Sequence, residues 1–378
     1  MVKIMKIPLI KPFITGEIKA RVGEVLDSGY LTEGSVTRQF EDSVKNYLGC
    51  DFALGVCNCT VGLEMALRCL GIRPGDEVIV PDYTYPATAS VVQIVGANIV
   101  IVDVDPTSML IDYETLEKAI TRRTKAIIPV SIFGNPLDYA RLWEIKEKYN
   151  LYIIEDAACS IGASFQGISV GNLADISVFS FHPRKFITTG EGGMVTTNNR
   201  RWAEWMESYK HFGMASSASR RGTRFEIVGS NYKLSDILAA IGLEQMKQID
   251  MLLAERSRIA ARYSDYLGKQ PGISLPQVTS RGIHSWQSYC IFTAQRDQII
   301  EELKEKQIET QIGTYALHMH PAFNQNKNCR IAGEMSGSRY AFEHCLTLPL
   351  YHDMTDDDQK YVVSELIRCI SSRPWEKR

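Results

Sequence analysis

A lysine near a glycine-rich turn and an aspartate at the end of an apolar run are the residues of this chain best suited to chemistry. Lys185 follows the apolar run 176–179 and precedes the turn 190–193, while Asp156 ends another apolar run 29 positions before the lysine. A reactive amine and a buried carboxylate are the groups that an aldehyde cofactor such as pyridoxal phosphate (PLP) most needs. The pair predicts a PLP enzyme with Lys185 and Asp156 as its catalytic residues.

Each of the two residues has a definite task in PLP chemistry. An exposed lysine has a pKa of about 10.4 and is protonated at neutral pH. Desolvation or a neighbouring positive charge lowers that pKa, so Lys185 in an apolar pocket could hold the cofactor as a Schiff base. Once an amino donor displaces it, the amine could shuttle a proton between the donor and the cofactor. Asp156 would keep the pyridine nitrogen protonated.

Both residues also have an ordinary structural interpretation. A single lysine near glycines is most often a surface residue, and an aspartate at the end of a strand most often caps a turn or a helix. Neither residue is specific when it is taken alone. The sequence around them has to decide between the two interpretations.

Three blocks of sequence around these residues resemble the DegT/DnrJ/EryC1/StrS family of sugar aminotransferases. The first is Glu-Asp-Ala-Ala around Asp156, the second runs over 179–193 through Lys185, and the third is Gly-Ser-Asn-Tyr-Lys-Leu-Ser-Asp at 229–236. The blocks occur in the family's order, and further matches extend over residues 7–351. The resemblance implies PLP fold type I, with a large α/β domain built on a mainly parallel sheet and a smaller α+β C-terminal domain.

The resemblance also implies a role for individual residues at the cofactor. Lys185 matches the Schiff-base lysine, and Asp156 matches the partner of the pyridine nitrogen. Thr60 matches the phosphate-binding turn, where the amino end of a helix offers free N–H groups to an anion. Ser180 would add a hydroxyl group to the same phosphate. Tyr85 falls at the aromatic position that stacks on the cofactor ring, whereas without the family it reads equally well as a core residue.

Two cysteines depart from the commoner family pattern at positions that bind the cofactor. Cys59 stands where the phosphate turn usually has glycine, so this turn must adopt a conformation that a side chain tolerates. Cys159 stands where glutamine is frequent beside the cofactor ring, and a thiol is a weaker hydrogen-bonding group. The position that decides between the two reactions keeps the commoner family residue, Lys185. Family members that dehydrate sugars carry histidine at this position. The resemblance therefore favours transamination over dehydration.

Two other segments match parts of the family that complete the site. Asn231 matches an asparagine that reaches the cofactor phosphate from the neighbouring subunit, which implies a homodimer with shared active sites. In the segment 313–321, His318 and His320 would share one face of a strand and could bind a metal ion. No third clustered ligand accompanies them, so we expect no metal. The resemblance instead places this segment at the sugar-nucleotide side of the pocket, with His318 and Tyr315 as substrate-binding residues.

Length and charge limit the kind of protein. The chain has 378 residues, of which 45% are hydrophobic, and a formal net charge of −2. This length suggests two lobes, and we expect a large PLP-binding domain at 1–250 and a small domain at 251–378. The charge shows no overall signature of nucleic-acid binding. The short basic runs at 200–201 and 220–221 suit a solvated surface, or a substrate's diphosphate.

Cysteine usage and hydropathy indicate the compartment. The nine cysteines include no Cys-x-x-Cys pair, and the chain is long for a disulfide scaffold, which favours a reducing cytoplasm. No apolar run approaches the roughly 20 residues of a membrane span, and the amino terminus has no signal-peptide pattern. We expect a soluble cytoplasmic protein.

Alternating strand and helix patterns predict how the residues are positioned. Runs typical of strands alternate with helical patterns through the first two thirds, which predicts a largely parallel sheet between helices. Thr60, Asp156 and Lys185 would then converge at the carboxyl ends of the strands, where such sheets collect ligands. A long helix at 237–266 leads into a smaller lobe that closes over the site. The expected strands are 78–81, 99–104, 126–130, 152–155, 176–179 and 194–197.

The function predicted from these observations is amino-group transfer to a nucleotide-linked keto sugar, with glutamate as the donor that the resemblance implies. A PLP-dependent sugar dehydratase and a non-enzymatic regulator on the same fold are the alternatives. Lys185 argues against the dehydratase, and the lack of a DNA-binding module or basic tail argues against the regulator. No Gly-x-Gly-x-x-Gly follows an early strand, which disfavours a nicotinamide oxidoreductase. The nucleotide, the sugar and the aminated carbon, 3 or 4, stay open.

Overall fold

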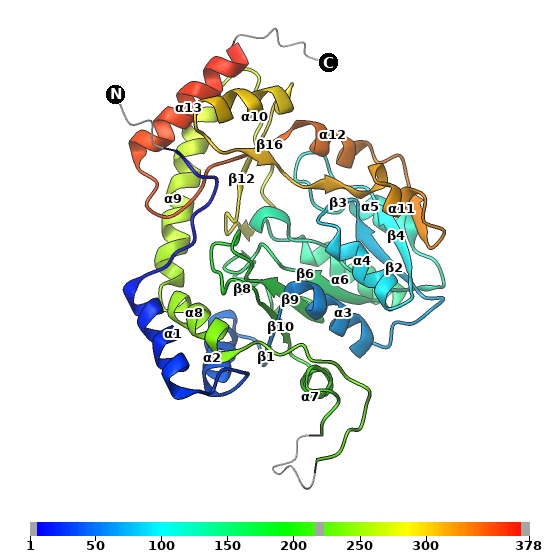
Figure 1. Ribbon diagram of the computed structural model, residues 1–378. Coiled ribbons are helices and arrows are strands. Elements are labelled where there is room, and N and C mark those ends of the chain that lie inside the picture. Colours follow the sequence, from blue (N-terminus) through cyan, green and yellow to red (C-terminus); the bar gives the residue numbers. More distant parts are fainter. Residues whose placement is uncertain (1–5, 216–222, 372–378) are drawn as a thin grey trace.

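An eight-stranded sheet forms the centre of the larger lobe in the computed structural model, which describes residues 6–215 and 223–371 (Figure 1). Strand β10 runs antiparallel to both of its neighbours, and all other neighbouring pairs are parallel. The sheet is therefore mainly parallel, as predicted. In spatial order the strands are β1 (Phe52–Val56), β10 (Gly193–Thr197), β9 (Ile176–Ser180), β6 (Tyr152–Asp156), β5 (Thr124–Ile127), β2 (Glu77–Pro81), β4 (Asn98–Val102) and β15 (Cys329–Ala332).

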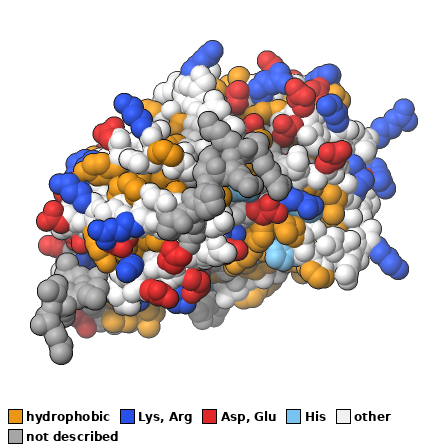
Figure 2. Space-filling model, turned by 90° about the horizontal axis from the view of Figure 1, so that it is seen from above, with side chains coloured by type: hydrophobic (Ala, Val, Ile, Leu, Met, Phe, Trp, Pro, Cys, Tyr) orange, Lys and Arg blue, Asp and Glu red, His pale blue; other side chains and the backbone are white. Residues whose placement is uncertain are grey.

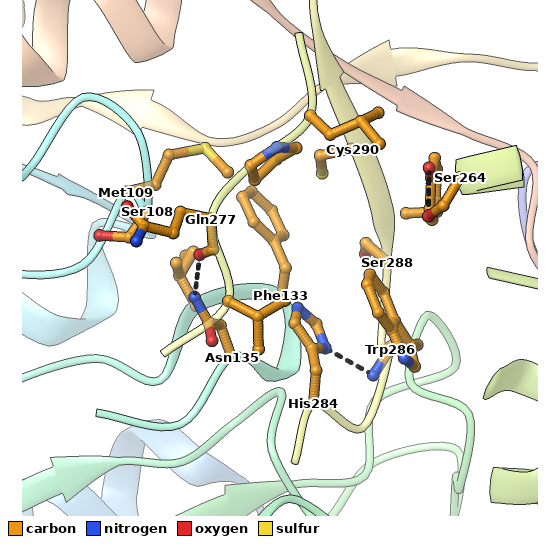
Figure 3. A pocket seen from close by; sticks show the side chains of 15 residues that line it. Ser108, Met109, Phe133, Asn135, Ser264, Gln277, His284, Trp286, Ser288 and Cys290 are labelled. Atoms are coloured by element: carbon orange, nitrogen blue, oxygen red, sulfur yellow. Dashed lines mark hydrogen bonds between the residues drawn. The ribbon is translucent and has the colours of Figure 1, made fainter. Parts of the chain in front are cut away.

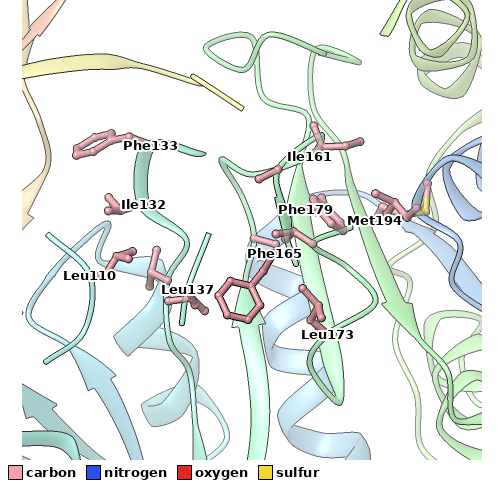
Figure 4. Packing of buried hydrophobic residues seen from close by; sticks show 14 of the residues in the cluster. Leu110, Ile132, Phe133, Leu137, Ile161, Phe165, Leu173, Phe179 and Met194 are labelled. Atoms are coloured by element: carbon pink, nitrogen blue, oxygen red, sulfur yellow. The ribbon is translucent and has the colours of Figure 1, made fainter. Parts of the chain in front are cut away.

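Helices cover both faces of this sheet because its strands are apolar on both sides. Consecutive residues of one strand belong to different buried clusters, as Ile153 and Ile154 show. Figure 4 shows side chains of the first cluster, such as Leu137, Phe165 and Phe179, gathered beside the strands. The helices are α2 (Ser35–Leu48), α5 (Tyr113–Ala119), α6 (Tyr139–Tyr149) and α8 (Asp236–Met246) on the first face, and α3 (Cys59–Cys69), α4 (Ala87–Ile94) and α7 (Arg200–Lys210) on the second.

Local sequence explains where the helices that frame the site begin. Helix α3 starts at Asn58, whose side chain accepts a hydrogen bond from the N–H of Val61 at 3.0 Å. Helix α8 starts in the same way at Ser235, which accepts from the N–H of Leu238. Capping side chains of this kind fix the first turn of a helix, and the first turn of α3 is part of the site described below.

A smaller lobe has its own core. An antiparallel sheet packs against helices there, and the side chains of Tyr263, Ile291 and Leu366 are buried between them. Ile7 joins this core and forms a bridge with Ile308, so the first described residues pack on the small lobe. The elements of this lobe are β12 (Tyr289–Phe292), β16 (Cys345–Leu348), β13 (Gln311–Ile312), α9 (Ile249–Leu267), α10 (Arg296–Glu305) and α13 (Asp356–Ser371).

The structure differs from the sequence expectation at the predicted long helix 237–266. It consists of α8 and α9, which are separated at Gln248, where the backbone has φ −111° and ψ 9°. Helix α8 packs on α1 (Gly16–Ser28) and α2 in the large lobe, whereas α9 contributes to the small-lobe core. The sequence hides this break because helix-forming residues continue through it without a proline or glycine.

Residues 313–335 return to the large lobe. Strand β15 pairs in parallel with β4 at the sheet edge, although it comes from the part expected to form the small domain. Strand β14 (Tyr315–Ala316) pairs with β3 (Tyr83–Thr84), beyond the carboxyl end of β2. The remaining elements are α11 (Pro321–Asn324), α12 (Ser336–His344), β7 (Ser164–Phe165), β8 (Ile168–Ser169) and β11 (Gly282–Ile283).

Two further observations concern the charges on the surface and the hydropathy of the helices. Seen from the small-lobe side, acidic and basic side chains are interspersed with apolar ones (Figure 2). Across residues 6–215 and 223–371, no helix has both the length and the apolar character needed to cross a bilayer. The basic pair Arg220 and Arg221, considered above for a diphosphate, lies outside the described residues.

Candidate active site

The two predicted catalytic residues lie beyond the carboxyl ends of adjacent parallel strands. Asp156 is the last residue of β6, and Lys185 lies in the loop that follows β9. Each residue is close enough to influence the pKa of the other. The side-chain nitrogen of Lys185 lies 3.0 Å from the sulfur of Cys159, which brings a third predicted residue to the same place. The fold therefore gathers Lys185, Asp156 and Cys159 into one site.

The amine of Lys185 is more basic in this structure than the sequence led us to expect. Burial is the largest single influence on Lys185 and opposes its charge. Cys159, Asp156 and Cys59 together outweigh burial, so the pKa of Lys185 is raised and not lowered. The sequence shows an apolar setting for the lysine, but only the fold places two sulfurs and a carboxylate around it.

Asp156 is buried and hydrogen-bonded, but it has no cationic partner in contact. One carboxylate oxygen accepts from the hydroxyl of Thr88 at 2.7 Å, and the other accepts from the N–H of Ala158 at 3.2 Å. Burial raises the pKa of Asp156, although both hydrogen bonds and Lys185 oppose the rise. No ion pair with Asp156 within 4.0 Å occurs among the described residues. A protonated pyridine nitrogen would supply the cation that such a carboxylate lacks.

The start of α3 lies next to these residues and offers groups that could hold an anion, since Asp156 and Lys185 both influence the pKa of Cys59. Gly193 of β10 approaches it so closely that a Cβ would lie 2.8 Å from backbone atoms of Asn58 and Cys59, so only glycine fits. Thr60 is in the first turn, where backbone N–H groups have no helical acceptor. The thiol of Cys59 is turned into the sheet, where it donates to the carbonyl of Val178 at 3.7 Å. The backbone of Cys59, and not its side chain, is therefore available to an anion.

Ser180 lies directly before the loop that carries Lys185, and Tyr85 lies directly after β3. Ser180 ends β9, and its hydroxyl oxygen accepts from the N–H of His182 at 3.4 Å. Tyr85 is 65% exposed, so it is not the core aromatic that remained an alternative for it. Its ring centroid lies 6.3 Å from that of Tyr315, because β14 pairs with β3. The pairing of β14 with β3 thus brings together Tyr85, predicted to bind the cofactor, and Tyr315, predicted to bind the substrate, although they lie far apart in the sequence.

The two histidines of 313–321 do not form a shared metal face. They lie in and after the 3₁₀ turn η3 (Leu317–Met319), and not on a strand as assumed from the sequence. The Nδ1 atom of His318 lies 2.5 Å from an oxygen of Asp82, whereas the ring of His320 packs edge-on against Tyr315 at 5.8 Å. Each histidine therefore has its own partner.

Sequence reasoning missed Asp82 and Thr88. Asp82 directly follows β2, so it occupies the same kind of strand-end position that singled out Asp156. That position was the available signal for Asp82. Thr88, in the first turn of α4, has no comparable signal, because its role depends on contact with Asp156 across 68 positions.

Asn231 lies apart from Lys185. It is exposed, it forms a bridge with His211, and its side chain accepts a hydrogen bond from Lys233. The next carbonyl, of Tyr232, accepts from the N–H of Cys57 at 2.9 Å, so this block runs beside the end of β1. Within the described part of the chain, no hydrogen bond joins Asn231 to Lys185, Asp156 or Thr60.

A family model and several known proteins match almost the whole length of this chain. The family model described as the DegT/DnrJ/EryC1/StrS aminotransferase family matches residues 12–367. The GDP-perosamine synthase of Caulobacter vibrioides is 35% identical, covering 96% of this chain and 97% of that protein. The spore coat polysaccharide biosynthesis protein SpsC of Bacillus subtilis is 33% identical, with 96% and 97% covered. A Streptococcus pneumoniae protein solved in a PLP form is 29% identical, with a TM-score of 0.90 and 97% and 99% covered.

Proposed function

Because the chain belongs to the DegT/DnrJ/EryC1/StrS aminotransferase family, we propose that it transfers the amino group of L-glutamate to a nucleotide-linked keto sugar, with PLP as its cofactor. The observation that carries the proposal is the placement of Lys185 and Asp156 beyond the carboxyl ends of β9 and β6. The amino end of α3 lies beside them, across Gly193. An amine, a carboxylate and an anion site are thus held together by rigid elements.

Each element of the site has a place in this reaction. When bound, PLP supplies an electron-accepting ring that stabilises negative charge at the α-carbon of an amino donor. Lys185 would hold the cofactor at its aldehyde group and could move the proton at the donor α-carbon. Asp156 would hold the proton on the ring nitrogen. Thr60, Ser180 and the backbone at Cys59 would hold the phosphate, while Tyr85 and Cys159 would border the ring.

A homodimer completes the proposed site. Asn231 is exposed and would reach the phosphate of the partner subunit. Exposed apolar side chains near it support a covered surface, since Val228 is 96% exposed and Tyr30 is 82% exposed. Glu33, which lies near Tyr30 in the sequence, approaches His211 to 2.7 Å, and His211 forms a bridge with Asn231.

A reducing compartment suits this protein. All nine cysteines lie in the described residues, and none of them forms a disulfide. Nine cysteines outside disulfides suit a cytoplasm that keeps cysteines reduced. We therefore place the proposed reaction in the cytoplasm.

The proposal is tested by separating cofactor attachment from substrate choice. Borohydride treatment of the PLP-loaded protein, followed by peptide mapping, should place the label on Lys185, and Lys185→Ala should keep the fold but take no label. Single-turnover amination of the bound cofactor should be faster with L-glutamate than with alanine or aspartate. The aminated protein should then be offered a panel of nucleotide keto sugars and the corresponding free sugars.

The outcomes bear on different parts of the proposal. Label on another lysine would overturn the catalytic assignment. Correct labelling with no transfer to any nucleotide keto sugar would retain the cofactor but reject the proposed acceptor. A preference for another amino donor would replace glutamate alone.

A further inference from the structure

Gln287 bonds to the chain on both sides of Lys185. Its side-chain oxygen accepts from the N–H of Phe186 at 3.1 Å, and its side-chain nitrogen donates to the carbonyl of Arg184 at 2.7 Å. The Gln287 residue is only 6% exposed. A single buried amide group therefore spans the two peptide groups that flank the lysine.

The backbone that carries Gln287 is itself fixed by a buried arginine. Arg256 of α9 donates to the carbonyl of Trp286 at 2.7 Å and to the carbonyl of Gln287 at 2.6 Å. Its guanidinium also lies 5.3 Å from the ring centroid of Phe186. Burial lowers the pKa of Arg256 to about 9, and within the described residues no carboxylate pairs with it. Charge-assisted bonds of this kind are stronger than those between neutral groups.

The segment 284–288 has two faces that serve different neighbours. His284, Trp286 and Ser288 line a cavity of about 260 Å³ (Figure 3). Ser285 and Gln287 alternate with them and contact the active-site segments, since the hydroxyl of Ser285 donates to the carbonyl of Cys159 at 3.4 Å. The segment thus contacts the residues next to both Lys185 and Cys159.

A glycine allows the segment to come this close. Gly134 has φ +99°, and a Cβ there would lie 2.5 Å from the hydroxyl oxygen of Ser285 and 3.0 Å from the backbone nitrogen of Gln287. From the other side, Gln245 of α8 bonds to both the N–H and the carbonyl of Thr188, at 2.9 and 3.0 Å. The lysine loop is therefore held by two buried glutamines, Gln245 near one end and Gln287 around Lys185 itself.

We propose that Gln287 is a positioning residue for Lys185, through which the segment before β12 sets the place of the reacting amine. The inference rests on the proposed function, in which Lys185 captures PLP covalently. Loops are the mobile parts of a fold, and a reacting group that is misplaced by about 1 Å loses about 100-fold in rate. An amide on both flanking peptide groups limits that displacement directly.

The test measures the rate at which PLP-free protein captures PLP covalently, by borohydride trapping at timed intervals and peptide mapping. Gln287→Met has a similar length and no hydrogen bonds, and it should slow capture at Lys185 by about tenfold to 100-fold. Gln287→Glu gives a second readout. A protonated carboxyl group can donate and accept like the amide, whereas an ionised one can only accept. The ratio of the Gln287→Glu capture rate to the wild-type rate should therefore approach one at low pH and fall as pH rises.

The matched control is Gln359→Met. Gln359 is a fully buried glutamine of α13 that donates to the carbonyl of Ile259 at 2.7 Å, away from the lysine loop. Its side chain makes one hydrogen bond where that of Gln287 makes two, so Gln359→Met should lower the melting temperature less than Gln287→Met and leave capture within twofold of the wild type. If both Gln287 variants capture PLP at the wild-type rate at every pH, the positioning role is wrong. If the wild type itself carries no label on Lys185, the proposed function fails instead.

Discussion

Asp82 and His318 form a close pair although 236 positions separate them. One carboxylate oxygen of Asp82 lies 2.5 Å from Nδ1 of His318, and the other accepts from the backbone N–H of His318 at 2.7 Å. Asp82 is fully buried, and Nε2 of His318 is buried without a hydrogen-bond partner among the described residues. The carboxylate at Nδ1 fixes the orientation of the ring and leaves Nε2 as the ring nitrogen without a partner in the described part of the chain. A hydroxyl group that reached Nε2 would satisfy it, and the sugar is the source that the proposed substrate contact of His318 requires.

Asp82→Asn should impair only the half of the reaction that involves the sugar. Loss of the charged partner should lower kcat/KM for the keto sugar by about tenfold to 100-fold, the size of one hydrogen bond to a charged group. Cofactor amination by glutamate should be unchanged. Asp103→Asn is the control, because Asp103 accepts from the N–H groups of Gly337 and Ser338 and has only a structural contact. Equal loss in both half-reactions would contradict the assignment.

Asp156→Asn should slow the chemical step much more than it weakens cofactor binding. The amide keeps the shape of the side chain but removes the charge that holds the ring nitrogen protonated. We expect single-turnover amination by glutamate at saturating PLP to fall by about 100-fold or more. Thr88→Val removes the 2.7 Å hydrogen bond to Asp156 and the 2.9 Å one shared with Thr84 but leaves the carboxylate in place, so it should have a smaller effect. A normal rate with a lowered melting temperature would show that Asp156 is only a structural cap.

Asn231→Ala and Lys185→Ala should complement each other if the active site is shared. Each variant alone should be inactive or weakly active, the first through loss of PLP and the second through loss of the amine. After mixing, half of the dimers combine both chains and have one intact site each, so about a quarter of the wild-type activity should return. Native mass spectrometry should confirm the mixed dimers. Mixed dimers without activity would place Asn231 at the site of its own chain.

Stability should depend on pH through His211. Its Nε2 lies 2.7 Å from a Glu33 oxygen and 3.5 Å from a Glu207 oxygen, and hydrogen bonds to Glu207 and Glu33 raise the pKa of His211 from 6.5 to about 9. Because the folded pKa is above the unfolded one, this contribution is complete below about pH 6.5 and is lost as pH rises through about 9. The melting temperature should fall over that range. His211→Gln should flatten the slope, whereas His344→Gln should keep it.

Much of the architecture follows from local sequence. All six strands expected from the sequence are present, and their ends differ from expectation by at most three residues. Apolar runs and turn residues are local signals, so they can be read without knowing what each strand contacts. The family resemblance and the α/β fold with a mainly parallel sheet are confirmed. Lys185 and Asp156 stand out because the ends of parallel strands must meet at one edge of a sheet.

Tertiary structure decided the relationships that join distant segments. The contact of Gln287 with the peptides around Lys185, the pair of Asp82 and His318, and the addition of β15 to the large sheet leave no trace in local periodicity. Tertiary structure also decides whether the pKa of Lys185 is raised or lowered, because burial lowers it whereas the neighbouring sulfurs and carboxylate raise it. Sequence determines which groups are present and on which elements they lie. Electrostatic and hydrogen-bond energies depend on distances between those elements, and only the folded chain sets these distances.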